Sequence, residues 1–205
     1  GYAVEQTGDA TVALVGYPSV GKSTLLNALT NADSDVGAYE FTTLDVNPGM
    51  LQFRGADIQL LDVPGLVAGA AAGRGGGREV LSVVRTADLL LVMLSPFEIE
   101  QFESITRELY DNKIRLDTAP PNIRITKQGK GGIDVNATDE LDLDHGTVKE
   151  VLRERGFVNA DVTIRGNPDI DELIDGVMDN RVYLPSLVVL NKIDLVDSSY
   201  LEGVT

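Results

Sequence analysis

The segment with the clearest chemical potential is 16–23, Gly-Tyr-Pro-Ser-Val-Gly-Lys-Ser, which fits the phosphate-loop pattern G-x-x-x-x-G-K-[ST]. The two pattern glycines allow backbone N–H groups to face phosphate oxygens, and the helix expected next adds the positive end of its dipole. Lys22 is suited to reach the β- and γ-phosphates, and the Ser23 hydroxyl is suited to ligate Mg²⁺. The segment therefore predicts a site for a nucleoside triphosphate with magnesium, formed by Gly16, Pro18, Ser19, Val20, Gly21, Lys22, Ser23 and Thr24.

Two further segments are expected to complete the phosphate end of this site. Asp62 follows the apolar run 58–61, the arrangement in which a strand delivers a carboxylate that holds Mg²⁺ through water. Pro-Gly then turns the chain, so that the Gly65 N–H can meet the γ-phosphate. In nucleotide switches a loop after the first helix supplies a threonine for Mg²⁺ and the γ-phosphate. Either Thr42 or Thr43 could do so here, and we favour Thr43.

The tetrapeptide 191–194, Asn-Lys-Ile-Asp, indicates which base is bound. The Asp194 carboxylate can accept hydrogen bonds from guanine N1 and the 2-amino group, whereas adenine lacks both donors and would leave the carboxylate unpaired. Asn191 can bond guanine from its other edge, and the Lys192 stem can pack across the base plane. The order of the motifs therefore favours GTP and disfavours an ATPase of the same fold.

The elements that must position these residues follow from the hydrophobic pattern. Short apolar, β-branched runs bounded by loops predict buried strands of a mostly parallel sheet, and the segments between them predict helices. We expect a three-layer α/β/α fold of the P-loop kind. The expected strands are 11–15, 50–53, 58–61, 88–94 and 184–190, and the expected helices are 24–29, 78–86 and 97–111.

The composition changes between residues 113 and 165, where short alternating segments are separated by Pro-Pro and Gly-Lys-Gly-Gly. We interpret 113–165 as a small inserted α+β domain that divides the larger domain into 1–112 and 166–205. Its one expected helix, 148–155, has Thr147 and Glu150 spaced as a capping box. A further helix is expected after it, with Asn167 as N-cap and Pro168 at its first position.

The charge balance is strongly acidic, with 17 Lys and Arg against 32 Asp and Glu and a net charge of −15. An excess of carboxylates keeps a surface hydrated where salt screens charges beyond about 3 Å at 1 M, so we favour adaptation to a high-salt cytosol. An ordinary acidic cytosolic protein is the alternative. The chain contains no cysteine, which excludes disulfides and thiolate metal sites. No apolar run approaches the length of a membrane span, and no signal peptide opens the chain, so a cytoplasmic location is expected.

Two local features leave alternatives open. The interval 118–133 contains Arg124, Lys127 and Lys130 and no acidic residue, which is suited to RNA phosphates but equally fits a solvated hairpin that balances nearby carboxylates. The single histidine, His145, follows an acidic run and could belong to a metal site, although a solvated surface explains it as well.

The sequence resembles the developmentally regulated GTP-binding proteins, of the Obg-like branch of translation-factor-related GTPases. The resemblance rests on Gly-Tyr-Pro-Ser-Val-Gly-Lys-Ser-Thr-Leu-Leu, Tyr-Glu-Phe-Thr-Thr-Leu, Gln-Leu-Leu-Asp-Val-Pro-Gly-Leu, the glycine-rich run that follows and Arg-Thr-Ala-Asp, and covers essentially the whole chain. It implies GTP hydrolysis with Mg²⁺, an insert related to the second domain of ribosomal protein S5, and association with ribosomes and a small stabilising partner protein. Beside these proteins the chain looks incomplete, because a fifth guanine-contact loop and a TGS domain would follow Thr205.

Two departures from familiar switches bear on the reaction. Leu66 stands where Ras-like proteins place a water-orienting Gln, so we expect slow intrinsic hydrolysis. Several relatives bind a stimulating K⁺ through an Asn in the phosphate loop, where this chain has Ser19, which leaves K⁺ as a candidate cofactor. The expected activity is hydrolysis of GTP to GDP and phosphate in a ribosome- or translation-associated switch. The alternative is a GTP-gated RNA- or protein-binding module with little hydrolysis.

Overall fold

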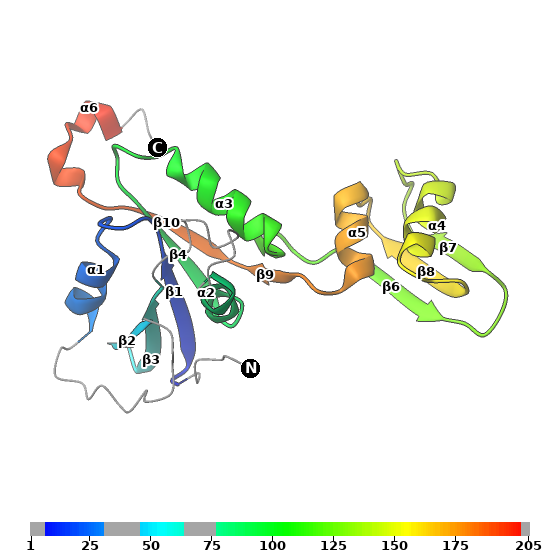
Figure 1. The fold of residues 1–205 in the computed structure, drawn as a ribbon, viewed down its shortest axis with the longest axis horizontal. Helices are drawn as coiled ribbons and strands as arrows, with labels where there is room; N and C mark the ends of the chain where they lie inside the picture. The colour runs from blue at the N-terminus through cyan, green and yellow to red at the C-terminus, as the bar shows by residue number, and fades with distance from the viewer. Residues whose placement is uncertain (1–6, 31–45, 64–76, 202–205) are drawn as a thin grey trace. The chain divides into compact units, whose positions relative to one another are not determined.

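A computed structural model describes residues 7–30, 46–63 and 77–201, and the chain divides into two compact units. The first unit comprises Gly1–Asp117 and Leu184–Thr205, and the second comprises Thr118–Tyr183. The second unit therefore differs from the expected insert 113–165, mainly because the helix that follows residue 165 packs within this unit. Figure 1 shows the order of the elements within each unit.

The first unit is built on a five-stranded sheet with the order β10-β4-β1-β3-β2. β1 pairs in parallel with β3 and β4, β10 pairs in parallel with β4, and β2 pairs antiparallel with β3 as the hairpin expected from the sequence. The prediction of a mostly parallel sheet is confirmed. Its strands are β1 (Ala10–Val15), β2 (Asn47–Phe53), β3 (Ala56–Asp62), β4 (Leu89–Leu94) and β10 (Ser186–Leu190).

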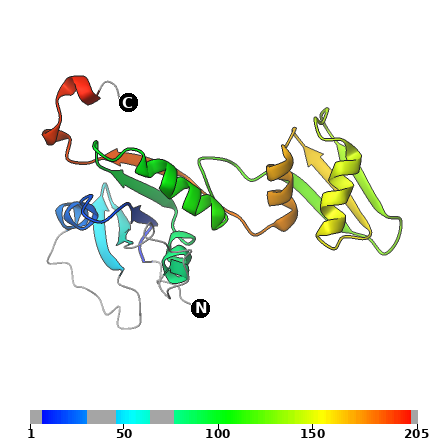
Figure 2. The same ribbon diagram turned by 45° about the horizontal axis from the view of Figure 1, so that its top comes forward.

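Helices lie on both faces of this sheet, as parallel strands require, but they leave β10 partly uncovered. Leu187 is 54% exposed and Val188 is 43% exposed, so the prediction of a buried strand over 184–190 was wrong for this strand. α1 (Lys22–Leu29) lies on one side, and α2 (Gly77–Val84) and α3 (Gln101–Asp111) lie on the other (Figures 1 and 2). Leu26 of α1 belongs to a buried cluster with side chains of β1, β3 and β4. On the other side, Ile105 and Leu109 of α3 are fully buried. The chain described ends in a 3₁₀ turn (Ile193–Leu195) and α6 (Ser198–Leu201).

The second unit is a three-stranded sheet with two helices packed on one face. The strands have the order β6-β8-β7, with β6 antiparallel and β7 parallel to β8. Valine, leucine and isoleucine side chains from the sheet and both helices form its core. The elements are β6 (Asn122–Lys127), β7 (Ile133–Ala137), α4 (His145–Glu154), β8 (Ala160–Arg165) and α5 (Ile170–Met178).

Both helices of the second unit begin at other caps than expected. Asp144 caps α4, because its carboxylate accepts hydrogen bonds from the Thr147 N–H at 3.0 Å and from the Thr147 hydroxyl. Asp169 caps α5 and forms a reciprocal capping box with Glu172. The predictions of a Thr147–Glu150 box and an Asn167 cap were therefore wrong, since an aspartate that precedes the first turn is an equally strong cap.

The short strand β5 (Ile114–Leu116) precedes the second unit in the chain, and the short strand β9 (Val182–Leu184) spans its last residues. The single strand expected over 184–190 is divided at Pro185, which has no N–H to donate to a ladder.

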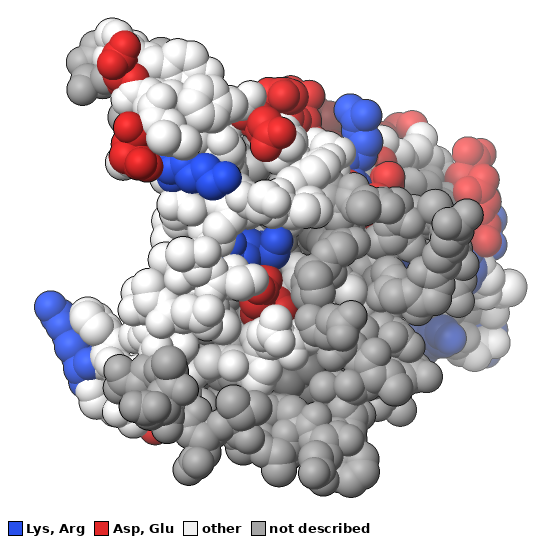
Figure 3. Space-filling model, turned by 60° about the vertical axis from the view of Figure 1, so that its left-hand side comes forward, with Lys and Arg blue, Asp and Glu red and all other residues white. Residues whose placement is uncertain are grey.

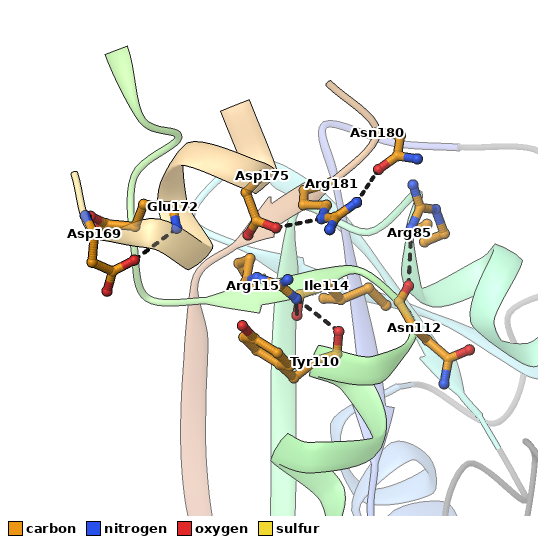
Figure 4. A network of polar contacts seen from close by, with 10 residues as sticks. All are labelled: Arg85, Tyr110, Asn112, Ile114, Arg115, Asp169, Glu172, Asp175, Asn180 and Arg181. Carbon is orange, nitrogen blue, oxygen red and sulfur yellow. Dashed lines mark hydrogen bonds and ion pairs between the residues drawn. The ribbon is translucent and has the colours of Figure 1, made fainter. Parts of the chain in front are cut away.

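Figure 4 shows polar contacts within each unit. In the first unit Arg115 donates to the Tyr110 carbonyl at 2.8 Å, so the end of α3 is held by a buried guanidinium. In the second unit Arg181 and Asp175 form an ion pair at 2.6 Å.

Candidate nucleotide-binding site

The parallel register brings the three predicted motifs to one edge of the sheet. The carboxyl ends of β1, β3, β4 and β10 lie together there, because neighbouring parallel strands run the same way. Val63 N–H donates to the Leu14 carbonyl at 3.1 Å, and Asn191 N–H donates to the Leu94 carbonyl at 2.9 Å. The loop 16–21, Asp62 and the tetrapeptide 191–194 are therefore neighbours at the position where open α/β sheets bind ligands.

Lys22 is buried in the phosphate loop and is held by the loop itself. Its Nζ donates to the carbonyls of Gly16 at 2.9 Å and Tyr17 at 3.2 Å. Only 8% of the residue is exposed, and burial lowers the pKa of Lys22, an effect that the negative charge of Asp62 partly opposes. The ammonium group is thus kept beside the loop in surroundings that favour the arrival of negative charge.

The Ser23 hydroxyl donates to Oδ2 of Asp62, which joins the first turn of α1 to the end of β3. Asp62 is 4% exposed, and its other oxygen, Oδ1, is buried without a hydrogen-bond partner among the described residues. Such an orphaned carboxylate oxygen costs roughly 1–3 kcal/mol in a folded protein. A hydroxyl next to an unsatisfied carboxylate oxygen is a donor set that fits Mg²⁺ or a water bound to it.

Asn191 connects the base motif to the phosphate loop. Its side-chain Nδ2 donates to the carbonyl of Val20 at 2.8 Å, and the Lys192 ammonium donates to the carbonyl of Ser19 at 2.7 Å. Gly21 has φ +108°, and a Cβ there would collide with the Asn191 amide. Sequence reasoning assigned Asn191 and Lys192 to the base and missed these bonds, for which the motif itself carries no signal.

Asp194 lies in the exposed 3₁₀ turn that follows, where a carboxylate is open to a ligand. Tyr17 adds a second unpredicted contact, because its hydroxyl bonds to Ser104 Oγ of α3 at 3.2 Å. Three predicted site residues, Thr42, Thr43 and Gly65, lie outside the described residues, as does Leu66.

The structure does not bring the three predicted RNA-contact residues to one surface. Alternate residues of a strand face opposite sides of a sheet, so Arg124 lies on the open face of β6 and Lys127 on the face that carries the helices. Lys130 lies in the turn between β6 and β7.

His145 is the first residue of α4. Within residues 7–30, 46–63 and 77–201, no group of three or more His, Asp or Glu is arranged to hold a metal ion. In the same part of the chain no helix is long and apolar enough to cross a membrane.

The fold and the motif geometry define a P-loop nucleotide-binding domain, and comparison with known proteins places it more narrowly. Residues 11–127 match the family model described as 50S ribosome-binding GTPase, and residues 130–205 match the model described as the C-terminal region of that domain. Because the first model alone matches more than half of the chain, the chain belongs to this GTPase family.

Relatives with similar sequences match nearly the whole chain. A GTP-binding protein of Halobacterium salinarum is 69% identical over 98% of this chain, and developmentally-regulated GTP-binding protein 1 of Xenopus laevis is 48% identical over 98%. The resemblance expected from the motifs is thereby confirmed. The chain spans about half the length of these relatives, 54% and 56% respectively. Among solved structures, the G domain of the T. maritima FeoB iron transporter matches 83% of this chain and 97% of its own at 21% identity, with a TM-score of 0.39.

The close approach of the Asn191 amide to Gly21 allows a direct test of the contact between the base motif and the phosphate loop. Gly21→Ala should weaken binding of a fluorescent GDP analogue at least tenfold, because the new Cβ displaces the Asn191 amide that holds the phosphate loop. Gly55→Ala is the matched control. Gly55 also has a positive φ, +87°, but nothing lies within 4 Å of its added Cβ, so affinity should be unchanged. Equal loss of affinity in the two variants would show that general destabilisation by an alanine at positive φ, rather than contact with Asn191, is responsible.

Proposed function

We propose that this chain binds GTP with Mg²⁺ and hydrolyses it to GDP and phosphate, as the nucleotide-dependent part of a ribosome- or translation-associated switch. The observation that carries the proposal is the hydrogen bond between Ser23 and Asp62 beside the buried Lys22, with one Asp62 oxygen that has no hydrogen-bond partner among the described residues. An ordinary structural aspartate at the end of a strand has no need of a buried lysine and an orphaned oxygen beside it.

The residues have separate roles in this proposal. Lys22 exchanges its bonds to the loop carbonyls for phosphate oxygens, and N–H groups at Gly21 and Gly65 stabilise the charge that develops on the γ-phosphate. Ser23, Thr43 and Asp62 would hold a magnesium ion, which would neutralise phosphate charge when bound. Water attacks the γ-phosphorus in line, and no covalent intermediate is formed with the protein.

The assignment of Lys22 and Ser23 is tested by removing each side chain. Lys22→Ala and Ser23→Ala should weaken binding of Mg·GTP by about two orders of magnitude, since hydrogen bonds to charged groups contribute roughly 1.5–3 kcal/mol. The measurement is titration of a fluorescent GTP analogue in the presence of Mg²⁺, together with release of phosphate. Lys149→Ala, in α4, removes the same charge far along the chain and should leave both unchanged. Unaltered affinity in the Lys22 variant, with the fold intact, would refute the phosphate site.

Guanine selectivity is assigned to Asp194, whose carboxylate lies in an exposed turn beside the loop held by Asn191. Asp194→Asn replaces two acceptors for guanine with an amide that matches the 2-oxo group of xanthine. We expect GDP affinity to fall at least tenfold and affinity for xanthosine diphosphate to rise, as measured by competition for the fluorescent site. A variant whose base preference is unchanged would place the base elsewhere.

Stimulation by K⁺ is a further part of the proposal and depends on Ser19. The Ser19 carbonyl already accepts from Lys192, whereas its hydroxyl is exposed and has no hydrogen-bond partner among the described residues. We therefore assign the K⁺ contact to that hydroxyl and to other loop carbonyls. GTP turnover should be faster in KCl than in NaCl at the same ionic strength, and Ser19→Ala should reduce the difference. Equal turnover in the two salts would exclude a specific K⁺ site.

The family description, 50S ribosome-binding GTPase, supports the ribosome-associated role. The relatives' names support GTP binding and do not mention the ribosome. A GTP-gated RNA- or protein-binding module with little hydrolysis remains the second candidate, and the cations of the second unit favour it. We propose that the second unit corresponds to the S5-like domain. In either case this unit and a small partner protein would work together with the one nucleotide site of the chain.

A further inference from the structure

The second unit carries its charges unevenly along the sheet. Lys127 of β6 and Ile133 of β7 both pair with Ala160, so these residues mark one end of the three strands. The segments at this end, 127–133 and 153–160, contain four cations and one carboxylate. The segments at the opposite end, 138–144 and 166–172, contain seven carboxylates and no Lys or Arg. We call the four cations of the first end, Lys127, Lys130, Arg153 and Arg155, the basic end.

Contacts between the loops hold the basic end together. The Gln128 N–H donates to the Asn159 carbonyl at 3.0 Å, and the Gly132 N–H donates to Asn159 Oδ1 at 2.8 Å. The Lys127 ammonium lies 5.4 Å from the centre of the Phe157 ring, within the range of a cation–π contact. The turn after β6 and the loop before β8 therefore form one surface, although they are far apart in the sequence.

The end of α4 is also fixed in this surface. Gly156 has φ +85° and closes the helix, with its N–H donating to the Arg153 carbonyl at 2.9 Å. The Phe157 N–H then donates to the Leu152 carbonyl at 3.0 Å, which anchors the loop to the core. Arg153 and Arg155 consequently project from a defined helix end.

The cations of the basic end are available to a ligand. All four are exposed, and none forms an ion pair with a carboxylate in the described part of the chain, whereas Arg181 of the same unit pairs with Asp175. The nearby carboxylates Asp134 and Asp161 point to the open face of the sheet, because their neighbours along each strand are buried against the helices. The sheet thus separates these carboxylates from Lys127, although Asp161 accepts a hydrogen bond from the Gln128 side chain in the turn after β6.

We propose that the basic end of the second unit is an RNA-binding surface whose lysines and arginines contact backbone phosphates. Exposed, unpaired cations in a chain of net charge −15 are suited to phosphate contacts. Val158, which is 74% exposed, and Phe157 beside it provide apolar contact for a ribose or an unstacked base. On the near surface in Figure 3, the described Lys and Arg side chains lie apart from one another.

This inference rests on the proposed ribosome-associated function, but it assigns a different set of residues from the cluster expected from the sequence. It retains Lys127 and Lys130, adds Arg153 and Arg155 from α4 and its cap, and leaves out Arg124, which lies on the open face of β6. The two sets can therefore be separated by experiment.

The test compares two double variants of the whole chain with equal loss of charge. Lys130→Gln with Arg155→Gln alters the basic end, and Arg124→Gln with Arg165→Gln alters the open face of the sheet. Lys127 is left in place because its contact with Phe157 also has a structural role. Binding is followed by fluorescence anisotropy of a labelled RNA hairpin of mixed sequence with single-stranded flanks, in the presence of GDP and over a range of KCl concentrations.

The basic-end variant should bind the RNA about tenfold more weakly at 0.1 M KCl. The slope of log K against log [KCl] should fall by about 1.4–1.8, because each phosphate that is no longer neutralised accounts for about 0.7–0.9 of that slope. The open-face variant should change RNA affinity by less than about threefold, because it alters only the net charge of the chain. This pattern would also exclude the sequence-predicted cluster with Arg124.

Three results would overturn the inference: no RNA binding by the unaltered chain at 0.1 M KCl, no effect of the basic-end variant, or equal effects of the two variants. If poly-glutamate binds with the same dependence on Lys130 and Arg155 while RNA does not, the surface recognises an acidic protein instead. GDP affinity is measured on each sample. A chain that binds GDP but not RNA retracts this inference alone, whereas one that binds RNA but not GDP refutes the nucleotide site alone.

Discussion

The contact between the Asn191 amide and the Val20 carbonyl is the constraint on which the nucleotide site depends. It joins residues separated by 171 positions, with the whole second unit between them in the chain. The contact is possible because β10 pairs with β4 in parallel and ends at the same edge, where Leu190 lies opposite Leu94. Gly21 completes the arrangement, since only a residue without a Cβ leaves room for the amide. The phosphate loop and the base loop are therefore joined directly, by this bond and by the bond from Lys192 to the Ser19 carbonyl.

The same edge concentrates groups that the protein leaves poorly satisfied. Lys22 is buried with its ammonium on loop carbonyls, and Oδ1 of Asp62 is buried with no partner among the described residues. An unsatisfied buried carboxylate oxygen destabilises a folded protein, and a lysine with a lowered pKa is one whose charge is poorly solvated. Phosphate oxygens and a hydrated cation would satisfy both groups at once. Binding of such a ligand would therefore raise the stability of the folded domain.

The sequence predicted those parts of the site in which one residue type is required at one spacing. Gly21, Lys22, Ser23 and Asp62 belong to this class, and the parallel sheet follows from the apolar runs between the motifs. Prediction from the sequence failed where several neighbouring residues could fill the same structural role. Asp144 and Asp169 can cap a helix as well as Thr147 and Asn167 can, so the sequence pattern could not decide between them. The sequence also did not indicate where the second unit ends, because α5 belongs to it through packing on β6 and α4.

The predicted RNA-contact residues Arg124, Lys127 and Lys130 are close in sequence, but they do not all lie on one face of the sheet. Along β6 the alternation of a strand separates Arg124 from Lys127 by the sheet itself, while a turn and a helix end bring Lys130 and Arg155 into one surface. In an acidic chain this separation has electrostatic consequences. At a screening length of about 10 Å, carboxylates on the opposite face still oppose a bound phosphate, whereas at about 3 Å, in 1 M salt, only groups in contact are felt. In a high-salt cytosol, which the acidic excess predicts, this long-range repulsion would be screened, and the direct contacts of the four cations with phosphates would weaken with salt as well.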